Sequence, residues 1–260
     1  MQVKDKVVVV TGGANGIGEA MCRRFTAEKA RAVVVTDIDA ERVQIVANEL
    51  GAFGLRADVT VESDLVDVVE QTENRFGPID LFCSNAGIIS TDEPDWLATS
   101  CPNALWQKSW EVHVMAHVYA ARAVLPGMIA RGSGYLLNTA SAAGLLNQVG
   151  SAAYSVTKHA AVGFSEALAI THSHQGIRVS VLCPQAVRTR MVAGHEEGSA
   201  SVDGMLEPEQ VAACVIQGLA EEKFLIMPHP EVQTYYQRKA SDYDRWLSGM
   251  NRLRQKLVPS

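Results

Sequence analysis

Three polar residues in the second half of the chain have types and spacing suited to moving a proton: Ser141, Tyr154 and Lys158. Tyr154 and Lys158 are four residues apart in a segment with helical spacing, so we expect them on one face of a helix. A tyrosine with an ordinary pKa of about 10 is a poor base at neutral pH, and a nearby ammonium group lowers that pKa. Such a tyrosine can exchange a proton with an alcohol or ketone oxygen of a substrate. Ser141 follows a strand-like run and can hydrogen-bond that same oxygen, so the three residues are candidate catalytic groups. A tyrosine and lysine at this spacing also occur on solvated helix faces, so the rest of the chain must decide.

A glycine-rich turn near the N-terminus is the second candidate site, because residues 11–18 read TGGANGIG. The turn lies between a β-branched run, 7–10, and a helical window that begins at Ile17. Glycines allow a diphosphate to approach the backbone, and the free N–H groups of a helix N-terminus attract it. The spacing GxxxGxG is not the common GxGxxG, but its place between a strand and a helix predicts a dinucleotide site. Its candidate cofactor-binding residues are Gly12, Asn15, Gly16, Ile17 and Gly18.

Two acidic positions follow the next two strands. Asp37 lies about twenty residues beyond the turn, where a carboxylate can accept both hydroxyls of an adenosine ribose and repel a 2′-phosphate. Asp37, with its neighbour Ile38, therefore favours NAD over NADP as the cofactor. The alternative role for Asp37 is a helix cap, which Asp39 can fill instead. Asp58 and Val59 close the third strand and are expected near the adenine, although a cap explains Asp58 nearly as well.

The elements that must position these residues alternate between strand and helix. Continuous apolar runs predict strands at 7–10, 32–36, 53–57, 79–83, 135–138 and 178–182. Helical spacing predicts helices at 17–29, 40–50, 62–76, 105–131 and 152–174. This order predicts an α/β fold: a doubly wound, mostly parallel sheet with helices on both faces. No boundary indicates a second domain, so residues 1–260 are expected to form a single dinucleotide-binding catalytic domain.

Two segments interrupt this alternation, and each follows a predicted strand. Residues 88–105 are polar and contain Trp96, and residues 188–206 are rich in small and acidic residues. Open α/β sheets bind ligands at the carboxyl ends of their strands, so both segments are predicted to be substrate-side loops. Residues 230–260 form a predicted helical tail with one apolar stripe, which packs on its own domain or on a neighbouring subunit.

Composition excludes several classes of protein. The chain has 23 Lys and Arg against 29 Asp and Glu, and this net charge of −6 argues against a nucleic-acid or anionic-membrane partner. With 47% hydrophobic and 20% charged residues, the chain is neither disordered nor fibrous. Five widely spaced cysteines without a CxxC motif predict reduced thiols and no zinc site. The N-terminal apolar run is too short for a signal peptide and no stretch of eighteen apolar residues occurs, so a cytoplasmic protein without a membrane span is expected.

With these motifs, the chain resembles the short-chain dehydrogenase/reductase family over nearly all of its length, through about residue 228. The matching positions are 11–18, Asp37, Asp58, Val59, 84–87, Ser141, 154–158 and 184–189. The resemblance implies a Rossmann-type fold and reversible hydride transfer between NAD(H) and an alcohol or ketone carbon, with no metal.

The same resemblance implies roles for individual residues. It makes Tyr154 the catalytic acid/base, has Ser141 orient the substrate, and has Lys158 hold the nicotinamide ribose and tune the tyrosine. Further cofactor contacts are implied for Asn85, Ala86, Gly87, Pro184, Val187 and Thr189.

Three positions depart from the family pattern. His113 stands where the family usually has an asparagine that supports a water linked to the lysine; it either keeps an altered catalytic relay or only packs in the core. His117 lies one turn later, but no third ligand is visible, so a metal site is not expected. Gln185 replaces a common glycine and projects either toward the nicotinamide and substrate or to the surface, and Ser84 replaces an asparagine in a mild change.

The expected function is NAD-dependent oxidation and reduction of a hydrophobic secondary alcohol or ketone. Its predicted substrate-contacting residues are Ala143, Gln148, Gln185 and Met191, with Trp96 and Trp106 as covers. Two alternatives stay open: dehydratase or epimerase chemistry on the same fold, and a non-catalytic NAD-binding scaffold silenced at His113. The resemblance to the family also implies a homodimer or homotetramer, built partly from helices 105–131 and 152–174.

Overall fold

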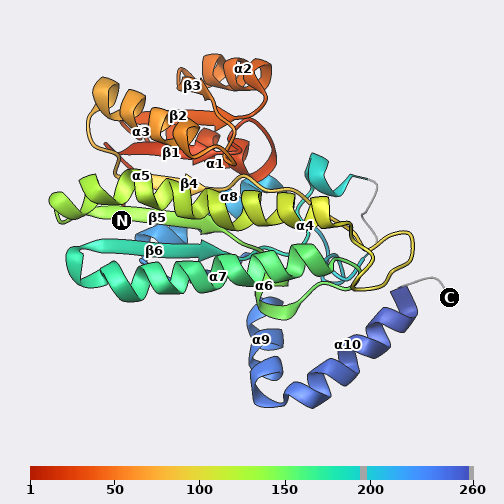
Figure 1. The fold of residues 1–260 in the computed structure, drawn as a ribbon. Helices are drawn as coiled ribbons and strands as arrows, with labels where there is room; N and C mark the ends of the chain where they lie inside the picture. Colours follow the sequence, from red (N-terminus) through yellow and green to blue (C-terminus); the bar gives the residue numbers. More distant parts are fainter. Residues whose placement is uncertain (194–197, 258–260) are drawn as a thin grey trace.

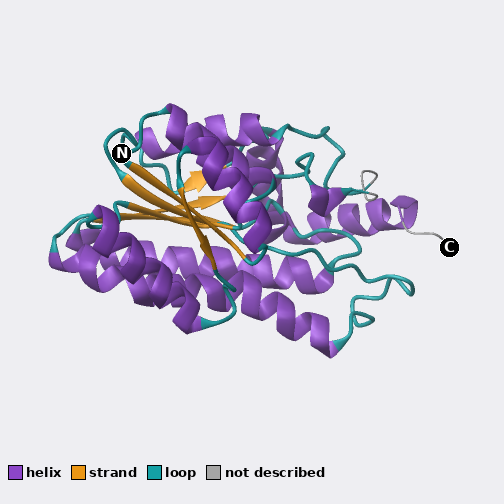
Figure 2. Cartoon of the chain, turned by 90° about the horizontal axis from the view of Figure 1, so that it is seen from above, coloured by secondary structure: helices purple, strands orange, loops and turns teal. Residues whose placement is uncertain are grey.

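A seven-stranded parallel sheet forms the centre of the computed structural model, which describes residues 1–193 and 198–257 (Figures 1 and 2). The strands are β1 Val7–Thr11, β2 Ala32–Asp37, β3 Phe53–Arg56, β4 Leu81–Ser84, β5 Gly134–Thr139, β6 Ile177–Leu182 and β7 Leu225–Ile226. Their spatial order is β3-β2-β1-β4-β5-β6-β7, and every neighbouring pair is parallel. The predicted parallel α/β sheet is confirmed.

Helices cover both faces of the sheet because alternate side chains of the strands point to opposite sides. Val7 and Val9 of β1 pack in a cluster with α3, α5 and α7, and Val8 and Val10 pack in a second cluster with α1, α2 and α8. All four valines are fully buried, as expected for a central strand covered on both faces. The larger helices are α1 Gly16–Ala27, α2 Ala40–Leu50, α3 Glu62–Phe76, α5 Ala116–Ala130, α7 Ala152–His172 and α8 Pro208–Ala220.

The predicted helix 105–131 is a longer composite that runs from α4 (Asn103–Trp110) through one π-helical turn (Glu111–Met115) into α5. Helix α4 begins at Asn103, inside the segment 88–105 that was predicted to be a loop. Among the helices described, Asn103–Ala130 is the one with the length and composition to cross a membrane, and 56% of its most apolar stretch is buried inside the protein. A core helix of a water-soluble protein meets the same criterion.

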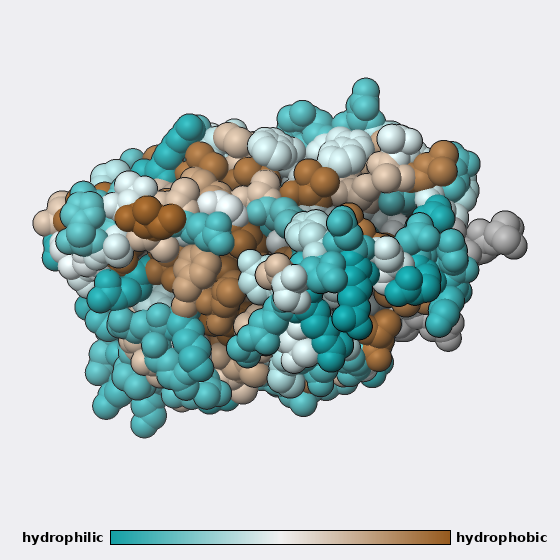
Figure 3. All heavy atoms as spheres, turned by 90° about the horizontal axis from the view of Figure 1, so that it is seen from below, coloured by the Kyte–Doolittle hydropathy of each residue, from teal (hydrophilic) through white to brown (hydrophobic). Residues whose placement is uncertain are grey.

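Two helices, α9 (Glu231–Ser241) and α10 (Tyr243–Leu257), form the C-terminal tail below the sheet in Figure 1. Helix α9 packs against the short helix α6 (Ala143–Leu146): Val232 is fully buried, and Lys239 Nζ donates to the Leu145 carbonyl at 2.6 Å. Helix α10 has no fully buried residue, and its Arg254 Nη2 donates to the Trp96 carbonyl at 2.6 Å. The face seen from below in Figure 3 includes apolar surface between hydrophilic regions. The predicted homodimer or homotetramer is not tested by this surface and stays a prediction.

The carboxyl ends of β1 and β4 are tied together by Thr11, which is 2% exposed. Its Oγ1 accepts hydrogen bonds from the backbone N–H groups of Asn85 at 2.9 Å and Ala86 at 3.2 Å. The side-chain amide of Asn85 donates to the Thr11 carbonyl at 3.1 Å in return. A single buried hydroxyl therefore holds the loop after β4 against the turn after β1.

We expect Thr11→Val to lower the free energy of unfolding by about 2 kcal/mol, because two backbone N–H groups lose their acceptor while the side chain keeps its shape. Thr72→Val is the matched control, since Thr72 is also fully buried but its hydroxyl donates only to the carbonyl of Val68 in its own helix. That control is expected to cost less than about 1 kcal/mol. Urea unfolding of both variants measures the difference, and equal losses would contradict this role for Thr11.

Candidate functional site

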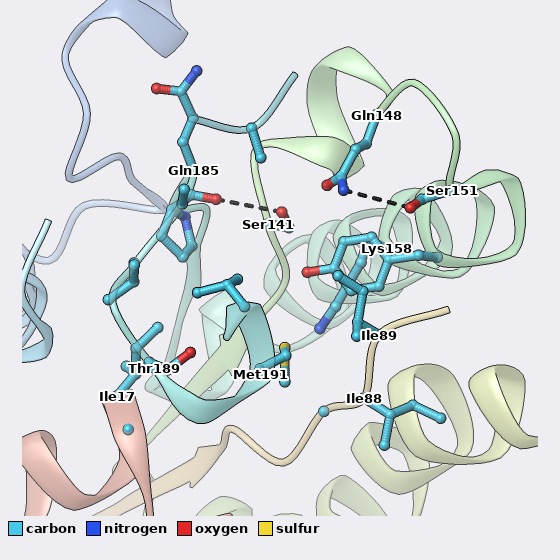
Figure 4. Close-up of a pocket in the computed structure, with 18 of the residues that line it drawn as sticks. Ile17, Ile88, Ile89, Ser141, Gln148, Ser151, Lys158, Gln185, Thr189 and Met191 are labelled. Atoms are coloured by element: carbon cyan, nitrogen blue, oxygen red, sulfur yellow. Dashed lines mark hydrogen bonds between the residues drawn. The ribbon is translucent and has the colours of Figure 1, made fainter. Parts of the chain in front are cut away.

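One cavity lies at the carboxyl ends of the strands, on both sides of the point where the order of the strands reverses between β1 and β4. It runs from Asp37 at the end of β2 to Gln148 after β5, so one continuous space joins the two candidate sites. Figure 4 shows Ile17 and Thr189 on one side of this space and Gln148 and Lys158 on the other. The predicted residues that line it are Gly12, Asn15, Gly16, Ile17, Asp37, Asn85, Ala86, Gly87, Ser141, Gln148, Tyr154, Lys158, Pro184, Gln185, Val187, Thr189 and Met191.

The glycine turn has the shape of a cradle that larger residues would fill. Gly12 has a φ of +62°, and a Cβ there would lie 2.9 Å from the Cα of Ala86. Gly16 has a φ of +52°, and its Cβ would lie 2.9 Å from the Cγ2 of Thr189. Helix α1 begins at Gly16, and its N-cap residue Asn15 makes no side-chain capping bond, so the helix end faces the cavity without a side-chain cap. These features fit the diphosphate of a dinucleotide.

Asp37 lies at the other end of the cradle, and its carboxylate is already partly engaged. One oxygen accepts from the Ala14 N–H at 3.3 Å and the other from the Asp39 N–H at 3.3 Å. A carboxylate has about four acceptor positions, so capacity remains for two ribose hydroxyls. Asp39 is the N-cap of α2 and accepts from the Arg42 N–H, so the capping role falls to Asp39 as the sequence allowed.

Four predicted cofactor residues do not belong to the described cavity lining: Gly18, Ile38, Asp58 and Val59. Asp58 Oδ1 accepts from both the N–H (2.9 Å) and the hydroxyl (2.7 Å) of Thr60, so this side chain stabilises the turn before α3. Val59 is 9% exposed and packs in the core. Gly18 serves close packing, because a Cβ there would lie 2.0 Å from the Gly12 carbonyl oxygen.

Tyr154 and Lys158 lie one turn apart at the start of α7, and both are nearly buried, at 9% and 3% exposure. Lys158 Nζ lies 5.6 Å from the centre of the Tyr154 ring and donates to the Thr139 carbonyl at 3.0 Å. Ser141 follows β5; its hydroxyl donates to the Pro184 carbonyl at 3.3 Å and accepts from the Ala143 N–H at 3.1 Å. The carboxyl end of β5 and helix α7 thus bring Ser141, Tyr154 and Lys158 together at one wall of the cavity.

Burial determines the acid strength of these groups. It raises the pKa of Tyr154 above its usual value of 10.0, although the Ser141 hydroxyl opposes this effect. The net direction of the Tyr154 pKa is therefore upward, opposite to the lowering expected from a neighbouring ammonium group, because the tyrosine is buried. Burial also lowers the pKa of Lys158 to about 8, so the ammonium form still predominates at neutral pH.

His113 lies in the π-helical turn behind the cavity and is fully buried. Its Nε2 accepts from the Ile88 N–H at 3.1 Å, so its Nδ1 carries the proton and donates to the Thr157 hydroxyl at 2.9 Å. Its ring meets the Tyr154 ring edge-on, with the centres 5.4 Å apart. Burial and the nearby Lys158 hold the pKa of His113 well below 6.5, so the imidazole is neutral.

His117 is buried beside His113, and neither of its ring nitrogens has a hydrogen-bond partner in the described residues. Burial lowers its pKa to about 3. Within residues 1–193 and 198–257, no group of three or more His, Cys, Asp or Glu could hold a metal ion.

The predicted substrate residues divide by the direction of their side chains. Gln148 and Met191 border the cavity, and the Gln148 amide donates to the Ser151 hydroxyl at 3.4 Å (Figure 4). Gln185 lines the cavity too, but its side-chain amide is directed away from Ser141 and donates to Asp203 at 3.0 Å. Ala143 is buried outside the described lining.

Several residues of the cavity wall come from segments without a sequence motif. Trp96 lines the wall as expected, whereas Trp106 is absent from the described lining. Sequence analysis missed Val149, whereas Ile88, Ile89, Thr91, Val192 and residues 198–201 lie in the segments 88–105 and 188–206 that were predicted to be substrate-side loops, although it named none of them individually. An apolar pair directly after the Asn85–Gly87 segment was the one available signal. Residues 194–197 of the predicted loop 188–206, and 258–260 of the tail, lie outside the described residues.

Comparison with known proteins shows which family the chain is similar to. Residues 6–200 match the family described as short chain dehydrogenase. The chain is 35% identical over 258 residues to 1-deoxy-11-beta-hydroxypentalenate dehydrogenase of Streptomyces exfoliatus, covering 95% of this chain and 92% of the relative. It is 33% identical to meso-2,3-butanediol dehydrogenase of Serratia marcescens, covering 82% and 86% of the two chains.

The fold is shared with solved structures. A short chain dehydrogenase/reductase from Burkholderia phymatum, crystallised in complex with NAD, superposes with a TM-score of 0.85 at 24% identity and covers 94% of this chain and 96% of that one. Sequence match, sheet order and the Ser141, Tyr154 and Lys158 arrangement agree, and the chain belongs to the short chain dehydrogenase family of oxidoreductases.

Proposed function

We propose that the protein uses NAD(H) to interconvert a hydrophobic secondary alcohol and its ketone, with Tyr154 as the acid/base. The observation that carries this proposal is the single cavity that joins the glycine turn and Asp37 to Ser141, Tyr154 and Lys158. A ligand that bridges the two ends brings a reactive group to the tyrosine hydroxyl. The bound nicotinamide supplies the chemistry of accepting or donating a hydride at the substrate carbon.

Tyr154 moves the proton that accompanies the hydride. In ketone reduction the raised pKa keeps Tyr154 protonated, so its hydroxyl donates a proton to the oxygen that becomes the alcohol. In alcohol oxidation the tyrosinate takes the hydroxyl proton while the carbon–oxygen double bond forms. Ser141 is placed to hold the same oxygen, and the charged Lys158 favours the tyrosinate that forms in reduction.

The charge at Asp37 supports NAD in preference to NADP. A 2′-phosphate beside this carboxylate would bring two negative charges together. Arg42 lies beside the turn, but its Nη2 donates to Glu19 at 3.0 Å and to the Ala14 carbonyl at 3.2 Å. The guanidinium is therefore committed to stabilising the turn.

The substrate end of the cavity supports a hydrophobic substrate. Its wall includes Ile88, Ile89, Trp96, Val149 and Met191. The two relatives described above have names that denote hydroxyl-bearing substrates, a hydroxypentalenate and a butanediol. An apolar wall with a few polar groups at one side is typical of pockets that orient a small apolar molecule by one oxygen.

Tyr154→Phe tests the chemistry. With a panel of cyclic, aryl and aliphatic secondary alcohols, we expect NAD-dependent turnover that the substitution lowers by about a thousandfold, because the acid/base is lost. NADH affinity, measured by fluorescence, is expected to stay within about threefold, since only a hydroxyl is removed. Tyr236→Phe on α9 is the control and should behave as the wild type. Turnover that persists in Tyr154→Phe would contradict the proposal.

Asp37→Ser tests the choice of cofactor. The wild type should prefer NAD over NADP in kcat/KM by at least about a hundredfold, and the substitution should reduce this ratio at least about tenfold, because the repulsion of the 2′-phosphate is removed. Asp39→Ser is the matched control: it removes the neighbouring carboxylate, while serine can still cap α2, so stability and the ratio should both stay unchanged. A ratio that does not change in Asp37→Ser argues against its role at the ribose.

His113→Asn separates the enzyme from the silent scaffold. The neutral imidazole accepts from Ile88 and donates to Thr157, and an asparagine side chain also offers an acceptor and a donor. We therefore expect wild-type turnover and a change of no more than about threefold in kcat for the variant. Because the His113 pKa lies well below 6.5, the two pH profiles of kcat/KM should coincide between about pH 6 and 9. A scaffold silenced at His113 would instead be inactive as wild type and gain turnover in His113→Asn.

A further inference from the structure

We propose that Asp92, in the loop after β4, is a positioning residue that caps α7 from outside the helix and so fixes the turn that carries Tyr154. Its effect on turnover rests on the function proposed above, whereas its effect on the helix can be measured without turnover. No sequence motif contains Asp92, and it makes no contact with the cradle or with Ser141, Tyr154 or Lys158 in the hydrogen bonds of the described residues.

The Asp92 carboxylate is buried against the start of α7. The residue is 4% exposed, and its two carboxylate oxygens lie 3.1 and 3.2 Å from the Ala152 backbone nitrogen. Its own N–H donates to the Gly150 carbonyl at 2.9 Å. Asp92 thus hydrogen-bonds the backbone on both sides of Ser151. Tyr154 follows two residues after Ala152.

Helix α7 has no cap of its own. Its N-cap residue is Ser151, which makes no side-chain capping bond, and the Ser151 hydroxyl accepts from Gln148 at the substrate end of the cavity. A helix N-terminus has unpaired N–H groups and a partial positive charge, so a carboxylate there stabilises it. A residue sixty positions away in sequence supplies this carboxylate to the catalytic helix.

The loop around Asp92 is held by further hydrogen bonds, which fix the position of the Asp92 carboxylate. The Asp92 carbonyl accepts from the Trp96 N–H at 2.7 Å and from the Ser100 hydroxyl at 2.7 Å. The Trp96 ring packs closely against Gly150, because a Cβ at Gly150 would lie 2.5 Å from the ring. Arg254 of α10 fixes the other side of Trp96 through its carbonyl.

The same loop forms part of the substrate wall. Thr91 and Trp96, which precede and follow Asp92 in the sequence, line the cavity, and so do Gly150 and Ser151 before helix α7. Movement of this wall would therefore be transmitted through Asp92 to the first turn of α7. This makes Asp92 a positioning residue, because it acts on Tyr154 through the backbone and does not touch the substrate.

The test compares Asp92→Ala, Asp92→Asn and Asp95→Ala in the presence of NADH. Asp95 is an exposed carboxylate of the same loop and serves as the matched control. Hydrogen exchange of a peptide that covers residues 150–158 is expected to be about tenfold faster in Asp92→Ala, which corresponds to the loss of one helix cap. Asparagine also caps helices, so Asp92→Asn should stay within about threefold of wild type.

Turnover supplies the second measurement. In Asp92→Ala we expect kcat to fall about thirtyfold, because a misplaced acid/base loses alignment. NADH affinity should change less than about threefold. Rescue of kcat by Asp92→Asn would show that the hydrogen bond to Ala152, and not folding in general, is what turnover requires.

Two results would overturn the proposal. One is exchange in residues 150–158 that is the same in Asp92→Ala and Asp95→Ala. The other is faster exchange with an unchanged kcat, which would reduce Asp92 to a purely structural cap. If the wild type turns over no alcohol of the panel, the proposed function fails, and hydrogen exchange still decides whether Asp92 holds the turn of Tyr154.

Discussion

The ammonium group of Lys158 is buried, and the arrangement of the site depends on keeping it charged there. Transfer of a cation from water to the protein interior is costly, so a buried lysine loses its proton unless the protein stabilises it. The Thr139 carbonyl at the end of β5 accepts its hydrogen bond. With a pKa of about 8, Lys158 keeps its charge at neutral pH. The bond also joins α7 to the sheet, so Tyr154 is placed relative to β5 and to Ser141 beyond it.

Close approach of backbones sets the other end of the cavity. The turn after β1 comes so near to Ala86 and Thr189 that side chains at Gly12 or Gly16 would collide with them. Thr11 and Asn85 then lock β1 to β4, and the Asn85 carboxamide oxygen also accepts from the Thr139 hydroxyl at 3.1 Å. The Thr139 carbonyl accepts the hydrogen bond from Lys158, so one network of hydrogen bonds connects the glycine turn with the wall that carries Ser141, Tyr154 and Lys158.

Patterns of neighbouring residues in the sequence predicted the features that depend on neighbouring residues. The alternation of buried strands and helical windows gave the sheet, and the glycine turn, Asp37, Ser141, Tyr154 and Lys158 proved to line one cavity. Strand β7 has two residues, which is too short for any periodicity to reveal. The Tyr154 pKa could not be predicted in direction, because burial depends on packing from distant segments. The partners of His113, Gln185 and Asp92 are equally non-local, since each hydrogen bond joins residues far apart in sequence.

The proposed catalytic residues and the proposed substrate wall are held by different parts of the chain. The carboxyl end of β5 and helix α7 hold Ser141, Tyr154 and Lys158, and these lie within residues 6–200 that match the family. The tail holds the loops of the substrate side: Arg254 bonds the Trp96 carbonyl, and the Tyr235 hydroxyl donates to Asp203 at 2.9 Å. Asp203 in turn receives the amide of Gln185, the residue that departs from the family's glycine. These tail contacts come from residues beyond the family match, so the part of the chain that supports the proposed substrate wall differs from the part that carries the proposed catalytic residues.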